Sequence, residues 1–186
     1  MDFNTIKENF KAHLAKTEES LKREFTTIRT GRANPAILDS VRVDAYGAMV
    51  PLNQVGNVNV PESRMLSITV WDKSLIRKVE QAIQEAGLGL NPMNDGSIIR
   101  LPVPPLSEER RLELVKLAGR YTEEARVAAR NVRREAMDAL KELKSQNVIS
   151  EDDQKRHEKE LQEMMDACMK AFDEHLKHKE AEIKQV

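Results

Sequence analysis

The sequence lacks the features that form disulfides, direct secretion or span a membrane. Among 186 residues there is one cysteine, Cys168, which excludes an intrachain disulfide and indicates a reducing compartment. The first residues contain no apolar signal core, and no apolar run approaches the roughly 20 residues that span a bilayer. We therefore expect a cytoplasmic protein with no membrane partner.

An excess of charge of one sign is also missing, since the net charge is −1. This argues against nonspecific coating of nucleic acid. The distribution is uneven, however, with a net charge of +2 over residues 106–146 and −4 over residues 147–186. Any nucleic-acid site should therefore be a local, shape-selected patch.

Aromatic residues make up only 4% of the chain, so the core must be aliphatic, which suits narrow helix packing better than a wide ligand cavity. The sequence contains no phosphate-binding loop, no nucleophile elbow and no zinc-protease helix motif. Gly87-Leu88-Gly89 lacks the third glycine of a dinucleotide fingerprint. These absences favour a binding protein over an enzyme and give no reason to expect a cofactor.

Two isolated features have both a chemical and a structural interpretation. Glu174, His175 and His178 could bind a metal from adjacent helical turns, but such groups on an acidic helix are usually solvated, so we predict no metal site. Cys168 lies on an apolar stripe without a basic neighbour that would lower its pKa. We predict that it fills a core.

Three stretches have the periodicity of amphipathic helices. The first covers about residues 3–28 and ends before Gly31. The second, Ser107–Gln146, has no proline and one glycine, which predicts a single helix of about 60 Å. The third begins at the side-chain cap Ser150 and runs to about Lys184. The turn between the last two is short, so we expect antiparallel neighbours.

The second helix combines an apolar seam with a basic edge. Small and apolar residues recur every seven positions in two rows: Val115, Thr122, Ala129, Ala136 and Leu143, and Ala118, Ala125, Val132 and Ala139. Cations share one flank: Lys116, Arg120, Arg126, Arg130, Arg133, Arg134, Lys141 and Lys144. This edge is either a solvated face or a phosphate-binding ridge, because arginine forks on a rigid helix bind phosphate oxygens in bidentate fashion. The sequence pattern leaves both interpretations open.

Between the first two helices the pattern changes to short alternating runs typical of strands. The predicted elements are strands around Val41–Val43, Val58–Val60 and Leu66–Val70, a helix over 73–86, and a hairpin of Leu88–Met93 with Ile98–Val103. We expect Tyr46 and Trp71 to pack within this module rather than to stack on bases.

The expected fold class is α+β: an elongated antiparallel three-helix bundle with an inserted small α/β domain, in an L-shaped two-domain architecture. Residues 1–30 and 106–186 would form the bundle, and residues 31–105 the inserted domain. Two short connections, near 30–35 and 103–106, would act as hinges.

Five motifs, in this order, resemble the bacterial ribosome recycling factor family. They are Ile28-Arg29-Thr30-Gly31-Arg32-Ala33-Asn34-Pro35, Gly87-Leu88-Gly89-Leu90-Asn91-Pro92, Pro104-Pro105-Leu106-Ser107-Glu108-Glu109-Arg110-Arg111, Ala125-Arg126-Val127-Ala128-Ala129-Arg130-Asn131-Val132-Arg133-Arg134 and Ile149-Ser150-Glu151-Asp152-Asp153. The resemblance covers the whole chain. Ser107 stands where the family often has threonine, a conservative exchange of helix caps.

The resemblance implies a cytoplasmic, monomeric translation factor without catalytic activity or cofactor. Such a factor binds the post-termination ribosome and, with elongation factor G and GTP, splits it into subunits. The implied contacts to large-subunit ribosomal RNA are Arg126, Arg130, Arg133, Arg134, Arg29, Arg32, Arg110 and Arg111. The implied hinge residues are Thr30, Gly31, Pro104 and Pro105. The alternative from the residues is a coiled-coil scaffold that binds protein partners through the bundle, with an enzyme built on the α/β module a distant third.

Overall fold

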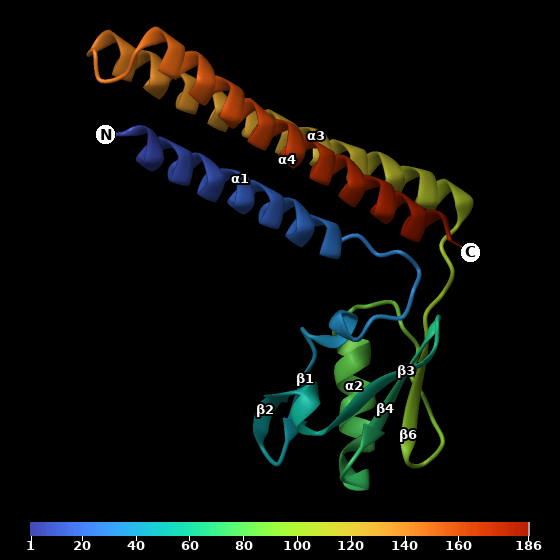
Figure 1. Cartoon of the computed structure of the whole chain (residues 1–186). Coiled ribbons are helices and arrows are strands. Elements are labelled where there is room, and N and C mark those ends of the chain that lie inside the picture. Colours follow the sequence, from blue (N-terminus) through green and yellow to red (C-terminus); the bar gives the residue numbers. More distant parts are fainter. Residues whose placement is uncertain (186) are drawn as a thin grey trace. The chain divides into compact units, whose positions relative to one another are not determined.

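The computed structural model describes residues 1–185, which separate into two compact units. The first unit, the bundle, comprises residues 1–29 and 108–185, and the second, the insert, comprises residues 30–107 (Figure 1). The bundle is entirely helical, and the insert contains strands and one α-helix. The predicted α+β class, a three-helix bundle with an inserted α/β module, is confirmed.

The bundle consists of α1 (Phe3–Thr26), α3 (Glu108–Ser145) and α4 (Glu151–Lys184), and each helix contacts the other two. Side-chain caps fix where α1 and α4 begin. Asp2 accepts a hydrogen bond from the Thr5 backbone, and Ser150 forms a reciprocal capping box with Asp153. Asn147, with φ of +57°, ends α3 in the left-handed conformation and starts the turn into α4.

A continuous stripe of buried residues joins the three helices. Its members from α3 are Leu114, Ala118, Thr122, Ala125, Ala129, Ala136, Leu140 and Leu143. Six of the nine residues in the two predicted rows are therefore buried. Val115, Val132 and Ala139 are only partly buried, and the buried Leu114 and Leu140 were not part of either row. A helix with 3.6 residues per turn drifts about 20° per heptad from a strict seven-residue repeat.

Two polar side chains are accommodated within this stripe. Thr122 is fully buried, and its hydroxyl donates a hydrogen bond to the Ala118 carbonyl at 2.8 Å. Cys168 is buried as predicted, and burial raises the pKa of its thiol to about 11. Its role is core packing.

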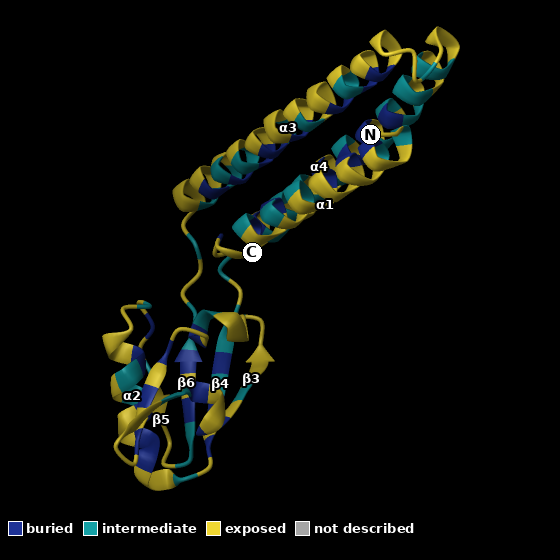
Figure 2. Cartoon of the chain, turned by 90° about the vertical axis from the view of Figure 1, so that its left-hand side faces the viewer, coloured by how far each residue is buried: buried dark blue, intermediate teal, exposed yellow. Residues whose placement is uncertain are grey.

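The insert is a four-stranded antiparallel sheet in the order β3-β4-β6-β5, together with a β1-β2 hairpin and helix α2 (Ile76–Glu85). The strands are β1 (Arg42–Ala45), β2 (Ala48–Pro51), β3 (Gly56–Glu62), β4 (Met65–Val70), β5 (Met93–Asn94) and β6 (Ile98–Pro102). Val79 and Ile83 of α2 share one core with Ile68 of β4 and Ile99 of β6, and buried positions alternate along these two strands (Figure 2).

The insert differs from expectation in three places. Leu88–Met93 is not a strand, because Pro92 cannot donate to a ladder, and pairing begins only at Met93. Strand β2 was not predicted. The expected packing of Tyr46 and Trp71 is wrong, since they are 77% and 59% exposed. Tyr46 lies in the β1-β2 turn with φ of +52°, and its hydroxyl donates to Asp72.

Within residues 1–185, none of the helices combines the length and the apolar character that crossing a bilayer demands.

Two glycines make a matched test of the packing. A Cβ at Gly56 would lie 2.5 Å from the Thr69 carbonyl oxygen on the paired strand, whereas a Cβ at Gly119 of α3 would meet nothing within 4 Å. We expect Gly56→Ala to destabilise the insert by about 1–3 kcal/mol. Gly119→Ala should instead stabilise the bundle by about 1 kcal/mol. Urea unfolding followed by Trp71 fluorescence reports on the insert, and helical circular dichroism reports mainly on the bundle. Equal midpoints for Gly56→Ala and the unmodified chain would contradict the close strand approach.

Candidate nucleic-acid interface

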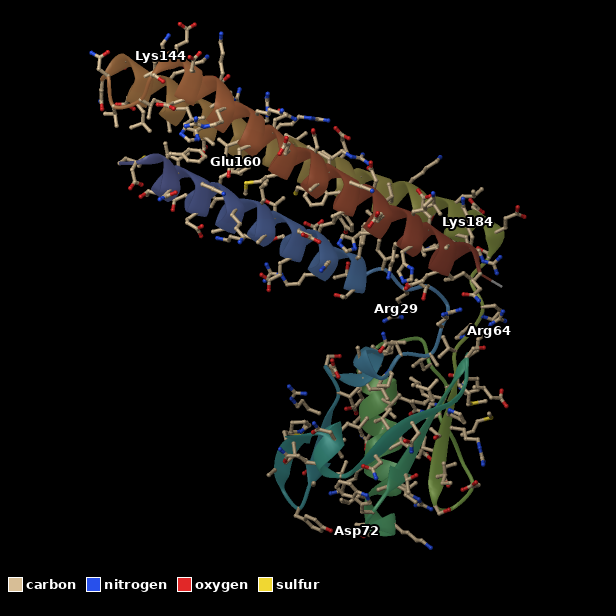
Figure 3. The ribbon with its side chains drawn as sticks, in the orientation of Figure 1. Arg29, Arg64, Asp72, Lys144, Glu160 and Lys184 are labelled. Atoms are coloured by element: carbon tan, nitrogen blue, oxygen red, sulfur yellow. The ribbon has the colours of Figure 1, made fainter. Side chains whose placement is uncertain are left out.

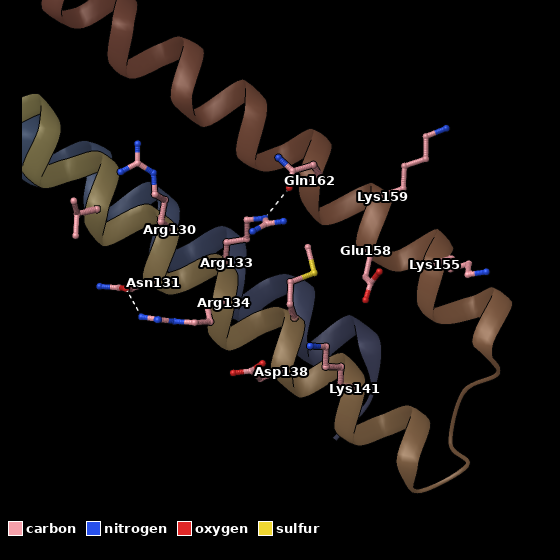
Figure 4. A pocket seen from close by; sticks show the side chains of 12 residues that line it. Arg130, Asn131, Arg133, Arg134, Asp138, Lys141, Lys155, Glu158, Lys159 and Gln162 are labelled. Carbon is pink, nitrogen blue, oxygen red and sulfur yellow. Dashed lines mark hydrogen bonds between the residues drawn. The ribbon is translucent and has the colours of Figure 1, made fainter.

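An open groove of about 920 Å³ runs between α3 and α4 (Figure 4). The α3 wall comprises Val127, Arg130, Asn131, Arg133, Arg134, Met137, Asp138 and Lys141, and the α4 wall comprises Lys155, Glu158, Lys159 and Gln162. Six of these side chains are cationic and two are carboxylates, which gives the groove a net charge of +4. A groove of this charge attracts polyanions.

Arg133 is held in position across the groove. Its Nε donates to the Oε1 of Gln162 at 2.6 Å, and the Nε2 of Gln162 donates to the Oδ1 of Asp166 at 2.8 Å. The Gln162 amide therefore joins the arginine of one helix to a carboxylate of the other. The terminal amino groups of Arg133 have no hydrogen-bond partner among residues 1–185. They are available to an external acceptor.

Two further arginines of the groove lie on the same flank of α3. Arg134 donates to the Asn131 side chain at 2.6 Å. Arg130, whose side chain is 57% exposed, forms an ion pair of 3.2 Å with Glu123. Hydrogen bonds from Arg126 and Arg130 lower the pKa of Glu123, so this carboxylate stays charged at neutral pH.

Arg126 has a different environment from the other predicted RNA contacts. Its side chain is only 24% exposed, and it forms ion pairs with Asp173 of α4 and with Glu123. The hydrogen bond to Asp173 raises the pKa of the guanidinium. Arg126 does not line the groove, and its contacts tie α3 to α4.

The other four predicted RNA contacts do not line the groove. Arg110 and Arg111 are in the first turn of α3, about 30 Å along the helix from Arg130 at 1.5 Å per residue. Arg110 forms an ion pair with Glu113 at 2.8 Å. Arg29 follows the end of α1 (Figure 3), and Arg32 belongs to the insert.

The predicted hinge residues belong to two chain segments that lie against each other. Gly31 has φ of +77°, and a Cβ there would lie 3.2 Å from the side chain of Leu106. Thr30 precedes Gly31, and the exposed Pro104 and Pro105 lie between β6 and α3. Only glycine takes the positive φ found at position 31 without strain.

The histidines of the suggested metal site have other partners. The Nε2 of His175 lies 2.8 Å from Glu18 of α1, and that of His178 lies 3.1 Å from Glu182. Within the described part of the chain, no three His, Cys, Asp or Glu side chains are grouped as metal ligands.

The α4 wall of the groove was not predicted from the sequence. Lys155, Lys159 and Gln162 are spaced by four and three residues, which places them on one helix face. The signal was present, but α4 lies within the most acidic part of the chain, and its overall charge concealed a local basic face.

Comparisons with known proteins agree with this architecture. The family model described as ribosome recycling factor matches residues 21–183. The ribosome-recycling factor of Ruegeria pomeroyi is 53% identical over 185 residues, covering 100% of this chain and 98% of that protein. That of Roseobacter denitrificans is 57% identical over 167 residues, covering 90% of this chain and 89% of that protein.

Two solved structures are also similar over the whole length. A solution structure of ribosome recycling factor has a TM-score of 0.77 and 40% identity, covering 100% of this chain and 99% of that one. The second describes models for the T. thermophilus ribosome recycling factor and the E. coli elongation factor G bound to the E. coli post-termination complex. It has a TM-score of 0.65, 42% identity and full coverage of both chains.

The difference between Arg126 and Arg130 is testable. We expect Arg126→Ala to lower the free energy of unfolding of the bundle by about 1 kcal/mol, because it removes a half-buried guanidinium that joins two helices. Arg130→Ala, on the exposed flank of the same helix, should change it by less than about 0.5 kcal/mol. Urea unfolding followed by circular dichroism measures both. An equal loss in the two variants would remove the distinction between a structural and a binding arginine.

Proposed function

We propose, because this chain belongs to the ribosome recycling factor family, that it binds the post-termination ribosome and, with elongation factor G and GTP, splits it into subunits. The observation that carries the proposal is the groove between α3 and α4. It has a net charge of +4 on a chain whose total is −1. The similarity to a factor bound with elongation factor G on the post-termination complex supports the same partners.

Docking depends on the arginines of the groove. Arg130, Arg133 and Arg134 are rigidly spaced on α3, and planar guanidinium forks bind phosphate oxygens of folded ribosomal RNA. We assign Arg29, Arg32, Arg110 and Arg111 to outer RNA contacts, since they do not line the groove. Arg126 contributes mainly by holding α4 beside α3.

Splitting depends on displacement rather than on covalent chemistry. We assign no catalytic step to this chain, and the energy comes from GTP hydrolysed by the partner factor. The insert moves relative to the bundle around Thr30, Gly31, Pro104 and Pro105 when the partner acts. The factor works as a monomer in the cytoplasm.

The first functional prediction concerns docking. Arg130→Ala and Arg133→Ala should each weaken binding to post-termination ribosomes and lower the slope of log affinity against log salt by about one unit, because each loses one phosphate contact. Co-sedimentation over a range of salt concentrations measures this. Arg23→Gln is the control, since it removes an exposed cation from α1, outside the groove.

Unchanged affinity and slope in both groove variants, with helicity intact, would show that the basic edge of α3 is only a solvated face. The coiled-coil scaffold that binds protein partners would then be the better description of the bundle.

The second functional prediction concerns the connection between the units. Gly31→Ala imposes a positive φ on alanine and crowds Leu106, so it should bias the backbone conformations available there. We expect near-normal ribosome docking but slower splitting. Polysome breakdown with elongation factor G and GTP measures the rate.

Gly87→Ala is the matched control for that experiment. Gly87 has a similar φ of +67°, but it lies within the insert, and a Cβ there would meet nothing within 4 Å. Equal splitting rates for the Gly31 and Gly87 variants would exclude a special role for the connection.

A further inference from the structure

We propose that α4 forms a second RNA-binding wall, in which Lys155 and Lys159 bind phosphates opposite the α3 arginines and Gln162 positions Arg133. The phosphodiester backbone of folded RNA would then lie in the groove, contacted from two helices, rather than on a ridge of α3 alone. This inference rests on the proposed function and specifies how its binding site is built.

The two lysines have few competing partners. Lys159 forms no ion pair within residues 1–185, and Lys155 has only a 3.9 Å pair with Glu151 in which both side chains are largely exposed. Glu158, the one carboxylate on this wall, accepts a hydrogen bond from Gln154 at 3.1 Å. The lysine ammonium groups are therefore free to bind an external anion as mobile point charges.

Gln162 holds Arg133 without neutralising it. Asp166 accepts from the Gln162 amide nitrogen, so the amide oxygen is turned toward the Nε of Arg133 (Figure 4). A carboxylate at position 162 would form an ion pair with the guanidinium and compete with phosphate. A neutral acceptor fixes the orientation of the arginine and leaves both its terminal amino groups and its full charge for the ligand.

The α4 wall is tested with a charge-matched pair of variants. Lys159→Gln should weaken binding to post-termination ribosomes by about threefold to tenfold and lower the salt slope by about one unit. Arg156→Gln is the control, because Arg156 is a cation of the same helix that lies outside the groove and pairs with Asp153 at 2.7 Å. Its affinity should stay within about twofold of the unmodified chain, since it loses no phosphate contact.

The positioning role is tested with a double-mutant cycle. Gln162→Met should weaken ribosome binding by about threefold, and Gln162→Glu by more, in the unmodified chain. In an Arg133→Gln background neither substitution should weaken binding further, because both act through the same guanidinium. A purely structural role for Gln162 would instead give equal losses in both backgrounds. Circular dichroism confirms that each variant keeps its helices.

The outcomes separate this inference from the proposed function. If Arg130→Ala weakens binding but Lys159→Gln does not, α4 makes no RNA contact and only this inference fails. The same holds if Arg156→Gln weakens binding as much as Lys159→Gln does, because the effect of the lysine is then not specific to the groove. Additive losses from Gln162 and Arg133 would overturn the positioning role. If the unmodified chain does not bind ribosomes, both proposals fail.

Discussion

The arrangement of the bundle depends on the small side chains with which α3 meets its neighbours. Ala118, Ala125, Ala129 and Ala136 are at most 8% exposed, and alanine allows helix axes to approach closely. Because the alanine contacts form only a narrow strip along α3, the long side chains on either side of that strip remain at the surface instead of being buried. The basic groove is therefore a consequence of how the core is packed.

Much of this architecture is predictable from local patterns. The caps at Ser150 and Asn147, and the proline-free stretch between Ser107 and Gln146, give the helix limits within a residue or two. The arginines of α3 are also visible, because one helix sets their spacing. The α4 wall is not, because which helix face meets α3 depends on how two separate helices pack. The exposure of Tyr46 could not be predicted either, because a residue in a turn belongs to no periodic pattern from which burial is read.

Charge placement accounts for selectivity better than total charge. The groove is cationic, whereas the chain as a whole carries −1, so the surface outside the groove is net negative. A polyanion is therefore attracted to the groove more strongly than to the rest of the surface taken as a whole, which orients the encounter. Hydrogen bonds to neutral amides, such as those of Gln162 and Asn131, keep the arginines ordered without reducing this contrast.

The burial of Cys168 has a consequence for the reactivity of the whole molecule. With a thiol pKa of about 11, only on the order of one molecule in ten thousand carries the thiolate at pH 7. This thiol should therefore react slowly with alkylating reagents and mild oxidants at neutral pH. A cysteine introduced at any exposed position would then be the single reactive nucleophile of its kind. A spectroscopic probe could therefore be attached to such a cysteine without first replacing Cys168.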